Sequence, residues 1–312
     1  MESPNDEDWR GHLASVFAEA LGAQVGTVET IASAGEVADG TLKLLARDRD
    51  GVPAAVALCS GAAAPDMVAR AMERARLARE VLGGELARVV IEPVAEGRWE
   101  ERSWCVLPFL ENLSRSRLVW TFQRRRLRPA LFGWLRSATA ATLREPSEEE
   151  VARDFRAPLA HLAAMESATS RVRAASEAAG RDLEADLWSP RQVLIHNDLW
   201  KGNILIDSRP GTPRAGRPWA ERFVLIDWPG ARVRGHALYD LLRLAHSLGT
   251  GRRALAAEVD AHCVILGCDR GQAQSHLLAA LAYLSAHLEQ FSEQAFARVC
   301  TSCLDSLEDL AS

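Results

Sequence analysis

The stretch "VLIHNDLWKGNILID", Val193–Asp207, decides the fold because it sets a short polar loop between two apolar runs. Runs of this length and composition are typical of buried strands. A second apolar run, "FVLIDWPG" at Phe223–Gly230, ends in a lone acid, Asp227. A strand–loop–strand hairpin would bring the loop and this acid together. The polar residues of the loop are His196, Asp198 and Asn203.

These residue types indicate a magnesium-nucleotide site. Mg²⁺ is a hard ion that takes one or two protein oxygen ligands and completes its shell with phosphate oxygens and water. The amide of Asn203 and the carboxylate of Asp227 supply such oxygens. Asp198 is a further carboxylate that can receive or orient the proton of an attacking hydroxyl. The pattern therefore predicts a magnesium-nucleotide site suited to phosphoryl transfer.

The words "HNDLWKGN" and "LIDW" resemble the catalytic and metal loops of the aminoglycoside-phosphotransferase-like kinases, which share the architecture of protein kinases. The "DLW" is particularly similar to fructosamine-type members. The resemblance implies that Asp198 is the catalytic base and that Asn203 and Asp227 are the metal ligands. It also implies that His196 braces the loop. Lys201, three residues after Asp198, would help to neutralise the transferred phosphoryl group, although a plain surface position is an equally open interpretation.

A later segment, "GHALYDLLRLAH" at Gly235–His246, resembles the family's helix behind the site. The resemblance makes Asp240 a structural brace that opens this helix. Trp228 stands where protein kinases have phenylalanine. The chain also lacks an activation segment of the protein-kinase type after "IDWPG", which makes a protein kinase the less attractive interpretation.

Upstream of residue 110 the sequence predicts a small sheet with helices. Helical periodicity covers Trp9–Gly22 and Pro65–Gly84. Two apolar runs around "RDRDG" predict a hairpin over Gly40–Gly61. "ARVVIEPV" (Ala87–Val94) and "SWCVLPFL" (Ser103–Leu110) predict two more strands.

The family expects a lysine in the third strand of this sheet, but "AVALCSG" puts Cys59 there. In one interpretation Lys43, in the preceding strand, contacts the phosphates instead, as in the with-no-lysine protein kinases. In the other, the chain is a pseudokinase that serves as a binding or scaffold module, and Lys43 is only a solvent-facing residue. The helix partner of the lysine is predicted to be Glu73, with Glu80 as a substitute. The two glutamates are seven residues apart and therefore share a helix face.

Three further nucleotide contacts are predicted by the same likeness. Gly35, in the loop "SAGEV", would cover the phosphates, and the backbone around Leu107 and Phe109 would face adenine. The acceptor is less defined. "RSRLVWTFQRRRLRP" (Arg115–Pro129) is either a helix with solvated arginines, whose stems cover apolar neighbours, or a contact surface for an anionic acceptor or membrane. "LIDWPGARVRG" bears some similarity to lipopolysaccharide-sugar kinases, the alternative with an anionic acceptor.

Composition is that of an ordinary globular chain: 312 residues, 48% hydrophobic, 25% charged, and a formal net charge of −5. This charge argues against a general nucleic-acid partner. The acidic start "MESPNDEDWRGH" and the absence of long apolar runs predict a cytoplasmic chain without signal peptide or transmembrane segment. The connection Ser208–Arg222, rich in proline, glycine and arginine, is expected to be exposed and mobile.

Six cysteines are expected to be free thiols. Cys300 and Cys303, one turn apart, fit a buried helix face, although with Cys263 and Cys268 they could also hold zinc.

Together these features predict an α+β fold of the bilobal protein-kinase-like kind. A small sheet-plus-helix N-lobe would span residues 1–110 and a larger helical C-lobe residues 111–312. The predicted function is an ATP- and Mg²⁺-dependent phosphotransferase acting on a hydroxyl of a small molecule such as a sugar or amino-sugar. The sequence leaves the acceptor, the choice of ATP or GTP, and the oligomeric state open.

Overall fold

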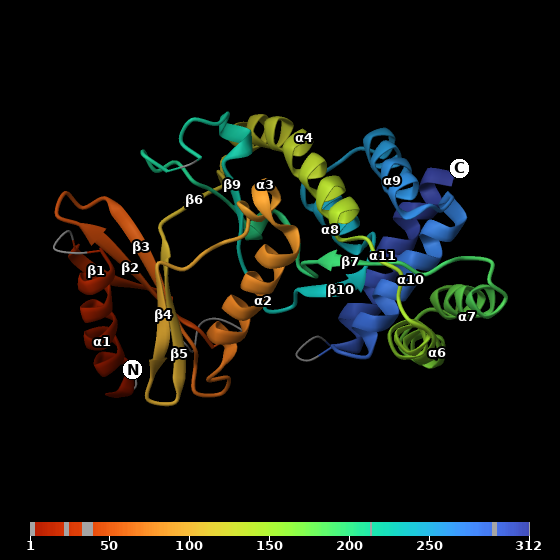
Figure 1. The fold of residues 1–312 in the computed structure, drawn as a ribbon, viewed down its shortest axis with the longest axis horizontal. Helices are drawn as coiled ribbons and strands as arrows, with labels where there is room; N and C mark the ends of the chain where they lie inside the picture. Colours follow the sequence, from red (N-terminus) through yellow and green to blue (C-terminus); the bar gives the residue numbers. More distant parts are fainter. Residues whose placement is uncertain (1–3, 22–24, 33–39, 213, 289–291, 312) are drawn as a thin grey trace. The chain divides into compact units, whose positions relative to one another are not determined.

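The computed structural model describes residues 4–21, 25–32, 40–212, 214–288 and 292–311 (Figure 1). The chain separates into two compact units. Unit 1 comprises residues 1–80, 87–115 and 202–230, and unit 2 comprises residues 81–86, 116–201 and 231–312. Each unit is described by itself.

The predicted α+β class is confirmed. A five-stranded antiparallel sheet with the order β1-β2-β3-β5-β4 forms from the N-terminal part of the chain, and the C-terminal part is largely helical. The strands of this sheet are β1 Val25–Ala32, β2 Leu42–Asp48, β3 Pro53–Cys59, β4 Ala95–Trp99 and β5 Arg102–Pro108.

The predicted hairpin over Gly40–Gly61 is present as β2 and β3. Its turn is closed by the Asp48 side chain, whose Oδ1 accepts the backbone N–H groups of Asp50 at 2.9 Å and Val52 at 2.8 Å. Gly51 adopts a φ of 78°, which a residue with a side chain rarely takes. The "RDRDG" signal therefore identified the turn, and the structure adds that the Asp48 side chain closes it.

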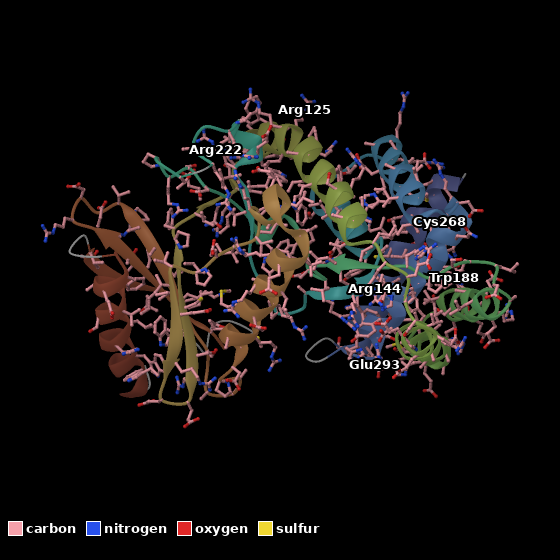
Figure 2. The ribbon with its side chains drawn as sticks, in the orientation of Figure 1. Arg125, Arg144, Trp188, Arg222, Cys268 and Glu293 are labelled. Carbon is pink, nitrogen blue, oxygen red and sulfur yellow. The ribbon has the colours of Figure 1, made fainter. Side chains whose placement is uncertain are left out.

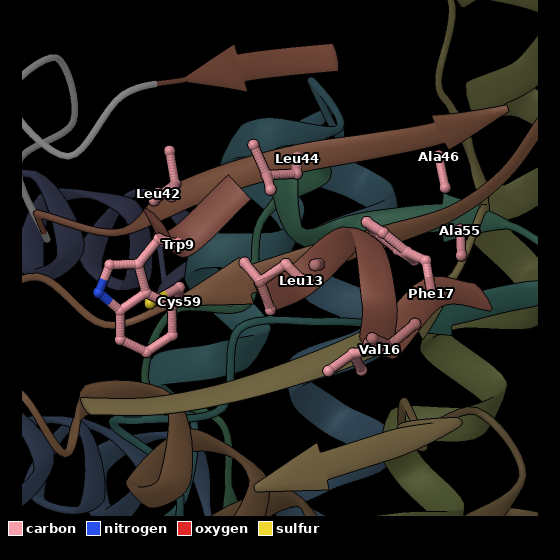
Figure 3. Packing of buried hydrophobic residues seen from close by; sticks show 11 residues of the cluster. Trp9, Leu13, Val16, Phe17, Leu42, Leu44, Ala46, Ala55 and Cys59 are labelled. Carbon is pink, nitrogen blue, oxygen red and sulfur yellow. The ribbon is translucent and has the colours of Figure 1, made fainter. Parts of the chain in front are cut away.

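The two faces of the sheet carry different helices. Helix α1 (Pro4–Leu21) packs Trp9, Leu13 and Phe17 against one face, where Cys59 lies beside Trp9 (Figure 3). Helix α2 (Met67–Leu82) reaches the other face, because its Arg76 forms an ion pair at 2.6 Å with Glu96 of β4. Both predicted helices are thus confirmed, and α2 ends at two glycines, Gly83 and Gly84, with positive φ.

The strand predicted over Ala87–Val94 is wrong. The segment forms the end of a short helix, α3 (Gly84–Ala87), and then an irregular run with a single bridge between Val90 and Leu225. Pro93 cannot donate to a ladder, which ends regular pairing in this run. The strand follows later, as β4, and the apolar residues before it are buried as a packed connection.

A second, three-stranded sheet of unit 1 has the order β6-β8-β9. Its strands are β6 Glu111–Asn112, β8 Ile204–Ile206 and β9 Phe223–Leu225, and a short 3-10 turn, η4, covers Trp219–Glu221. β8 and β9 pair antiparallel, with Ile204 opposite Leu225 and Ile206 opposite Phe223. The two apolar runs that flank the connection therefore form one hairpin, as their texture predicts.

The described residues of the connection Ser208–Arg222 are half-buried or exposed. Asp207, at its start, is fully buried and accepts hydrogen bonds from Arg209 and Arg214. The Arg222 guanidinium binds the backbone carbonyls of Arg217 at 2.8 Å and Ala215 at 2.6 Å. Although partly exposed, these arginines therefore tie the connection together.

Unit 2 holds the remaining helices and a two-stranded antiparallel sheet of β7 (Gln192–Ile195) and β10 (Arg232–His236). The helical segments are α4 Arg117–Thr142, α5 Glu148–Val151, the π-helical η2 Ala152–Arg156, α6 Ala157–Ala164, α7 Ser170–Glu184, α8 Tyr239–Ser247, α9 Arg252–Leu266, α10 Arg270–Ser285 and α11 Glu293–Ala311. A 3-10 turn, η3 (Lys201–Asn203), leads from unit 2 into unit 1.

The basic stretch Arg115–Pro129 lies on the first half of α4. Arg125, marked in Figure 2, is exposed, and Arg126 lies over the ring of Phe122 at 4.3 Å from its centroid. Leu118 is 84% exposed. The guanidinium of Arg126 thus stacks on Phe122, while Leu118 stays uncovered, and a ligand contact of this surface remains a prediction.

The cysteine pair of α11 packs inward. Cys300 and Cys303 are buried, and burial raises the pKa of both thiols, to about 12 for Cys300. No group of three or more His, Cys, Asp or Glu side chains in the described ranges is arranged to hold a metal ion. The described helices also include none that is long and apolar enough to cross a membrane.

Gly235 of β10 tests the packing that supports the polar loop. A Cβ at this position would collide with the Ile195 side chain, which is buried and directly precedes His196. We expect Gly235→Ala to lower the free energy of unfolding by about 1–3 kcal/mol, as measured by urea denaturation. The matched control is Gly180→Ala, inside α7 with no atom near the added Cβ, which should be neutral or stabilising by about 1 kcal/mol. Equal effects of the two substitutions would contradict this packing.

Candidate active site

The loop that follows β7 is held by hydrogen bonds to its own backbone. His196 is 2% exposed, and its Nδ1 accepts the Asp198 backbone N–H at 3.3 Å. A neutral ring must then carry its proton on Nε2. Asn197, between them, has a φ of 68°, a left-handed conformation that asparagine tolerates better than most residues. His196 therefore fixes the turn on which Asp198 stands, as its predicted bracing role requires.

Asp240, in the first turn of α8, holds the same loop from behind. Its Oδ2 accepts the backbone N–H of His196 at 2.6 Å, and the residue is 5% exposed. Burial raises the pKa of its carboxyl to about 6, against the opposing effect of the His196 and Asn197 backbone N–H groups. Leu238, which directly precedes α8, has a φ of 75°, a strained conformation for a bulky side chain. The chain accepts this strain where α8 begins.

Asp198 is oriented by two donors of unit 2. The Arg243 Nη2 donates to its Oδ1 at 2.7 Å, and the Trp200 indole Nε1 donates to its Oδ2 at 3.2 Å. Arg243 lies three residues after Asp240, so both side chains leave the same face of α8. Arg243 was not among the residues predicted from the sequence. Its spacing of one helical turn from Asp240 in "YDLLR" could have indicated it, but only the fold brings α8 to the loop.

Lys201 is the last residue of the segment 116–201 of unit 2. Its side chain lies near an aromatic ring. Its ammonium is 5.3 Å from the centroid of Trp120 on α4, and its backbone N–H donates to Ser247 Oγ at 3.1 Å. A cation above a ring keeps its charge at a defined place. Its predicted contact with a transferred phosphoryl group remains a prediction.

Asn203 and Asp227 lie at one end of the β8–β9 hairpin in unit 1. Asn203 directly precedes β8 and accepts the Ile226 backbone N–H at 3.0 Å through its carbonyl. Asp227 follows Ile226 and has a φ of 66°, which turns the backbone sharply after the strand. The next residue, Trp228, is fully buried and donates its Nε1–H to the Leu225 carbonyl at 2.9 Å. The hairpin register thus places the backbones of Asn203 and Asp227 at the same end of the hairpin, and their role as metal ligands remains a prediction.

Lys43 and Cys59 lie on opposite faces of the five-stranded sheet. Cys59 pairs with Leu42 in the cluster under α1, whereas Lys43 pairs with Leu58. Leu58 in turn pairs with Cys105, and Cys105 with Glu96, the residue that binds α2. Lys43 therefore lies on the face that α2 reaches. The thiol of Cys59 does not occupy the space a phosphate-binding lysine would need on that face.

The other predicted contacts of unit 1 are placed as follows. Glu73 is 56% exposed and forms an ion pair with Arg76, one turn along α2, and Glu80 is exposed on the same helix. Leu107 is buried in β5, and the Phe109 backbone N–H donates to the Ala54 carbonyl at 3.0 Å. That N–H therefore extends the pairing of β3 with β5, so a backbone contact of Phe109 with a nucleotide would have to use its carbonyl.

One predicted contact cannot be placed. Gly35 lies outside the described residues.

Comparisons with solved structures identify the fold. The apo crystal structure of a thermostable mutant of aminoglycoside phosphotransferase APH(4)-Ia matches with a TM-score of 0.54 and 16% identity, over 94% of this chain and 98% of that chain. A protein from Haemophilus somnus 129PT assigned as a fructosamine-3-kinase matches with a TM-score of 0.53 and 10% identity, over 95% and 96%. A GDP complex of a point mutant of aminoglycoside 2'-phosphotransferase-IIIa matches with a TM-score of 0.50 and 12% identity, over 96% and 95%.

Sequence-based searches give no match, either to models of protein families or to curated proteins. The structural matches nevertheless extend over nearly the whole chain. The chain therefore has the fold of the aminoglycoside-phosphotransferase-like kinases, as "HNDLWKGN" and "LIDW" predicted. At these identities the likeness shows the fold alone, and the reaction has to be inferred from the residues of the site.

The raised pKa of Asp240 predicts a specific pH dependence. Because the folded pKa of about 6 exceeds the ordinary value of 3.8, the folded state holds this proton more tightly. The resulting stabilisation is present below about pH 4 and is lost as the pH rises through 6. It amounts to on the order of 3 kcal/mol.

We expect Asp240→Asn, which cannot titrate, to lack this part of the slope when urea unfolding is followed from pH 4 to 7. All other carboxyl groups titrate in both proteins and cancel in the difference. Parallel stability curves for the two proteins would contradict the burial of an ionisable Asp240.

Proposed function

We propose that the chain is a nucleotide- and Mg²⁺-dependent phosphotransferase that acts on a hydroxyl of a small molecule, such as a sugar or amino-sugar. The observation that carries the proposal is the position of Asn203 and Asp227 at the same end of the β8–β9 hairpin, on a small-molecule-kinase fold. One amide oxygen and one carboxylate are the oxygen donors that Mg²⁺ accepts beside phosphate and water.

The donor set fits magnesium better than zinc. Both side chains offer oxygen, and the described residues contain no cluster of three or more His, Cys, Asp or Glu side chains of the kind that structural zinc needs. Asn203 and Asp227 would hold the ion, and the ion would neutralise charge on the nucleotide phosphates. The protein's own residues must then position the acceptor and the phosphates.

Asp198 would orient the acceptor hydroxyl. An ionised carboxylate has about four acceptor positions, so it can accept a hydroxyl in addition to Arg243 and Trp200. Those two donors fix the plane of the carboxylate, and phosphoryl transfer depends mainly on such positioning. In this proposal Arg243 is a positioning residue that acts through Asp198.

Lys43 would contact the nucleotide phosphates. Its place on the α2 face supports this role over that of Cys59. Composition adds a second argument, since Lys43 and Lys201 are the only lysines in a chain with 37 basic Lys and Arg residues. All other basic residues are arginines, whereas both lysines lie in segments that the proposed site uses. Lysine binds phosphate as a compact point charge.

The nucleotide itself is part of the proposal. One structural neighbour is a GDP complex, and the family likeness of the loops implies ATP. Parallel measurements with ATP and GTP therefore belong to every test below. A screen of small-molecule alcohols with labelled ATP would identify the acceptor.

Removing either acid should stop turnover. We expect Asp198→Asn to reduce phosphoryl transfer about 10²–10⁴-fold, because the acceptor hydroxyl loses its orienting carboxylate. Asp227→Asn should abolish Mg²⁺-dependent ATP turnover, because a metal ligand is lost. Asp50→Asn, in the exposed turn after β2, is the matched control and should leave turnover unchanged. Folding of each variant is checked by thermal unfolding, and full activity in both acid variants would refute the assigned roles.

The lysines allow a direct test of nucleotide contact. An acyl-phosphate derivative of ATP acylates a lysine amine near the bound phosphates, and the acyl–phosphate bond breaks to release ATP. Mass spectrometry should find the label on Lys43, with labelling suppressed by excess Mg-ATP. The Lys43→Arg variant, which lacks this amine, serves as the matched control and should lose the label. Labelling that Mg-ATP fails to suppress would favour the pseudokinase alternative, and so would the absence of a thermal shift at millimolar nucleotide.

A further inference from the structure

A pocket of about 450 Å³ lies in unit 1, and neither Asn203 nor Asp227 contributes to its described lining. The lining contains four guanidinium groups and two carboxylates, so its charged residues sum to two positive charges (4 − 2). These residues are Arg79, Arg88, Arg209, Arg214, Glu92 and Asp207. The proposed phosphotransfer uses none of them.

The charged side chains are fixed in place by one another. Arg209 grips the buried Asp207 with two hydrogen bonds, Nε to Oδ1 at 2.8 Å and Nη2 to Oδ2 at 2.9 Å, and the Arg214 Nη1 reaches the same Oδ2 at 3.1 Å. The Arg79 Nη2 lies 2.8 Å from the Glu92 carboxylate. Guanidinium groups that are already oriented lose little entropy when they bind an anion.

The positive charges also crowd one another. Burial lowers the pKa of Arg214, and the charges of Arg209 and Arg79 lower it further, against the stabilising Asp207. Burial would raise the pKa of Asp207, but its bonds to Arg209 and Arg214 outweigh this and keep its pKa low. One carboxylate thus balances part of the charge, and an added anion would relieve the remaining repulsion.

The rest of the lining is largely apolar. Ile91, Val94, Pro108, Leu110 and Val224 contribute to it. The volume lies in the range of about 300–1,000 Å³ that small-molecule sites occupy, and an inorganic anion alone would fill little of it. The complementary ligand carries a doubly charged group for the guanidinium groups and an apolar body for this surface. A phosphate monoester has this charge at neutral pH.

The pocket also touches the segment that the proposed function assigns to adenine. Pro108 and Leu110 line it, whereas the alternating residues, Leu107 and Phe109, do not. In extended chain, neighbouring side chains point to opposite sides. A ligand in the pocket would therefore press on the reverse side of the residues predicted to contact the nucleotide.

We propose that this pocket binds a small phosphate monoester with an apolar body, at a site separate from Asn203 and Asp227, and that its occupancy changes nucleotide affinity through residues 107–110. The binding step stands by itself, and the coupling step rests on the proposed function.

Calorimetric titration of the full chain with phenyl phosphate, without nucleotide or Mg²⁺, tests the binding step. We expect one molecule to bind per chain, with inorganic phosphate and phenol each binding at least about tenfold more weakly. Arg214→Gln should weaken binding about tenfold or more. Lys43→Ala should leave it unchanged, which separates this pocket from the nucleotide site.

A second variant keeps the test decisive if Arg214→Gln does not fold. Val94 is 48% exposed and lines the pocket, so Val94→Glu adds a competing negative charge without disturbing the core. Val81, on α2 and 43% exposed, provides the matched control Val81→Glu. We expect binding to be lost in Val94→Glu and retained in Val81→Glu. No binding to the wild-type chain at millimolar phenyl phosphate, or equal binding in both valine variants, would overturn the site.

The coupling step is measured as the change in ATP affinity at saturating phenyl phosphate. We expect about a 5–150-fold change, with ATP altering phenyl phosphate affinity by the same factor, because linkage is reciprocal. Binding of both ligands without mutual effect would overturn the coupling and leave the site standing. Failure of ATP to bind at all would refute the proposed function, and the calorimetric result would still decide the pocket.

Discussion

Helix α8 controls the loop after β7 through two ionisable side chains one turn apart. Asp240 accepts the His196 backbone N–H at 2.6 Å, and Arg243 binds the Asp198 carboxylate at 2.7 Å. A buried carboxylate needs hydrogen bonds to offset its desolvation, so Asp240 holds the loop while the His196 N–H offsets part of the desolvation of Asp240. Every role proposed for Asp198 depends on this mutual constraint, because a freely rotating carboxylate could not orient a hydroxyl.

A similar constraint shapes the hairpin of unit 1. The buried Asp207 binds Arg209 and Arg214, and this closes the connection between β8 and β9. The register of these strands in turn sets Asn203 beside Ile226 and places Asp227 just beyond it. One buried acid thus serves both the pocket behind residues 107–110 and the hairpin that carries the proposed metal ligands. In both units the chain uses arginine–carboxylate pairs where a loop must keep one shape.

The position of Cys59 changes how the site is understood. A cysteine at the expected lysine position suggests a degenerate kinase as long as only strand order is considered. The register shows that Cys59 packs under α1 and that Lys43 faces the α2 side. Successive side chains of a strand point to opposite faces of the sheet. Lys43 pairs with Leu58, one residue before Cys59, and therefore lies on the other face. Lys43 in the neighbouring strand is therefore the cation on the α2 face, and its contact with phosphate belongs to the proposed function.

The sequence by itself determined helices α1 and α2, the β2–β3 hairpin and the position of its turn, the kinase-like fold, and the loop that carries His196 and Asp198. These features are local: periodicity, turn residues and short polar words carry them. Tertiary structure alone decided that Arg243 binds Asp198, that Ala87–Val94 is a packed connection rather than a strand, and that Arg209 and Arg214 bind the buried Asp207. Each of these depends on which distant segment lies opposite, through burial, register or charge pairing, and no local pattern of residues encodes that partner.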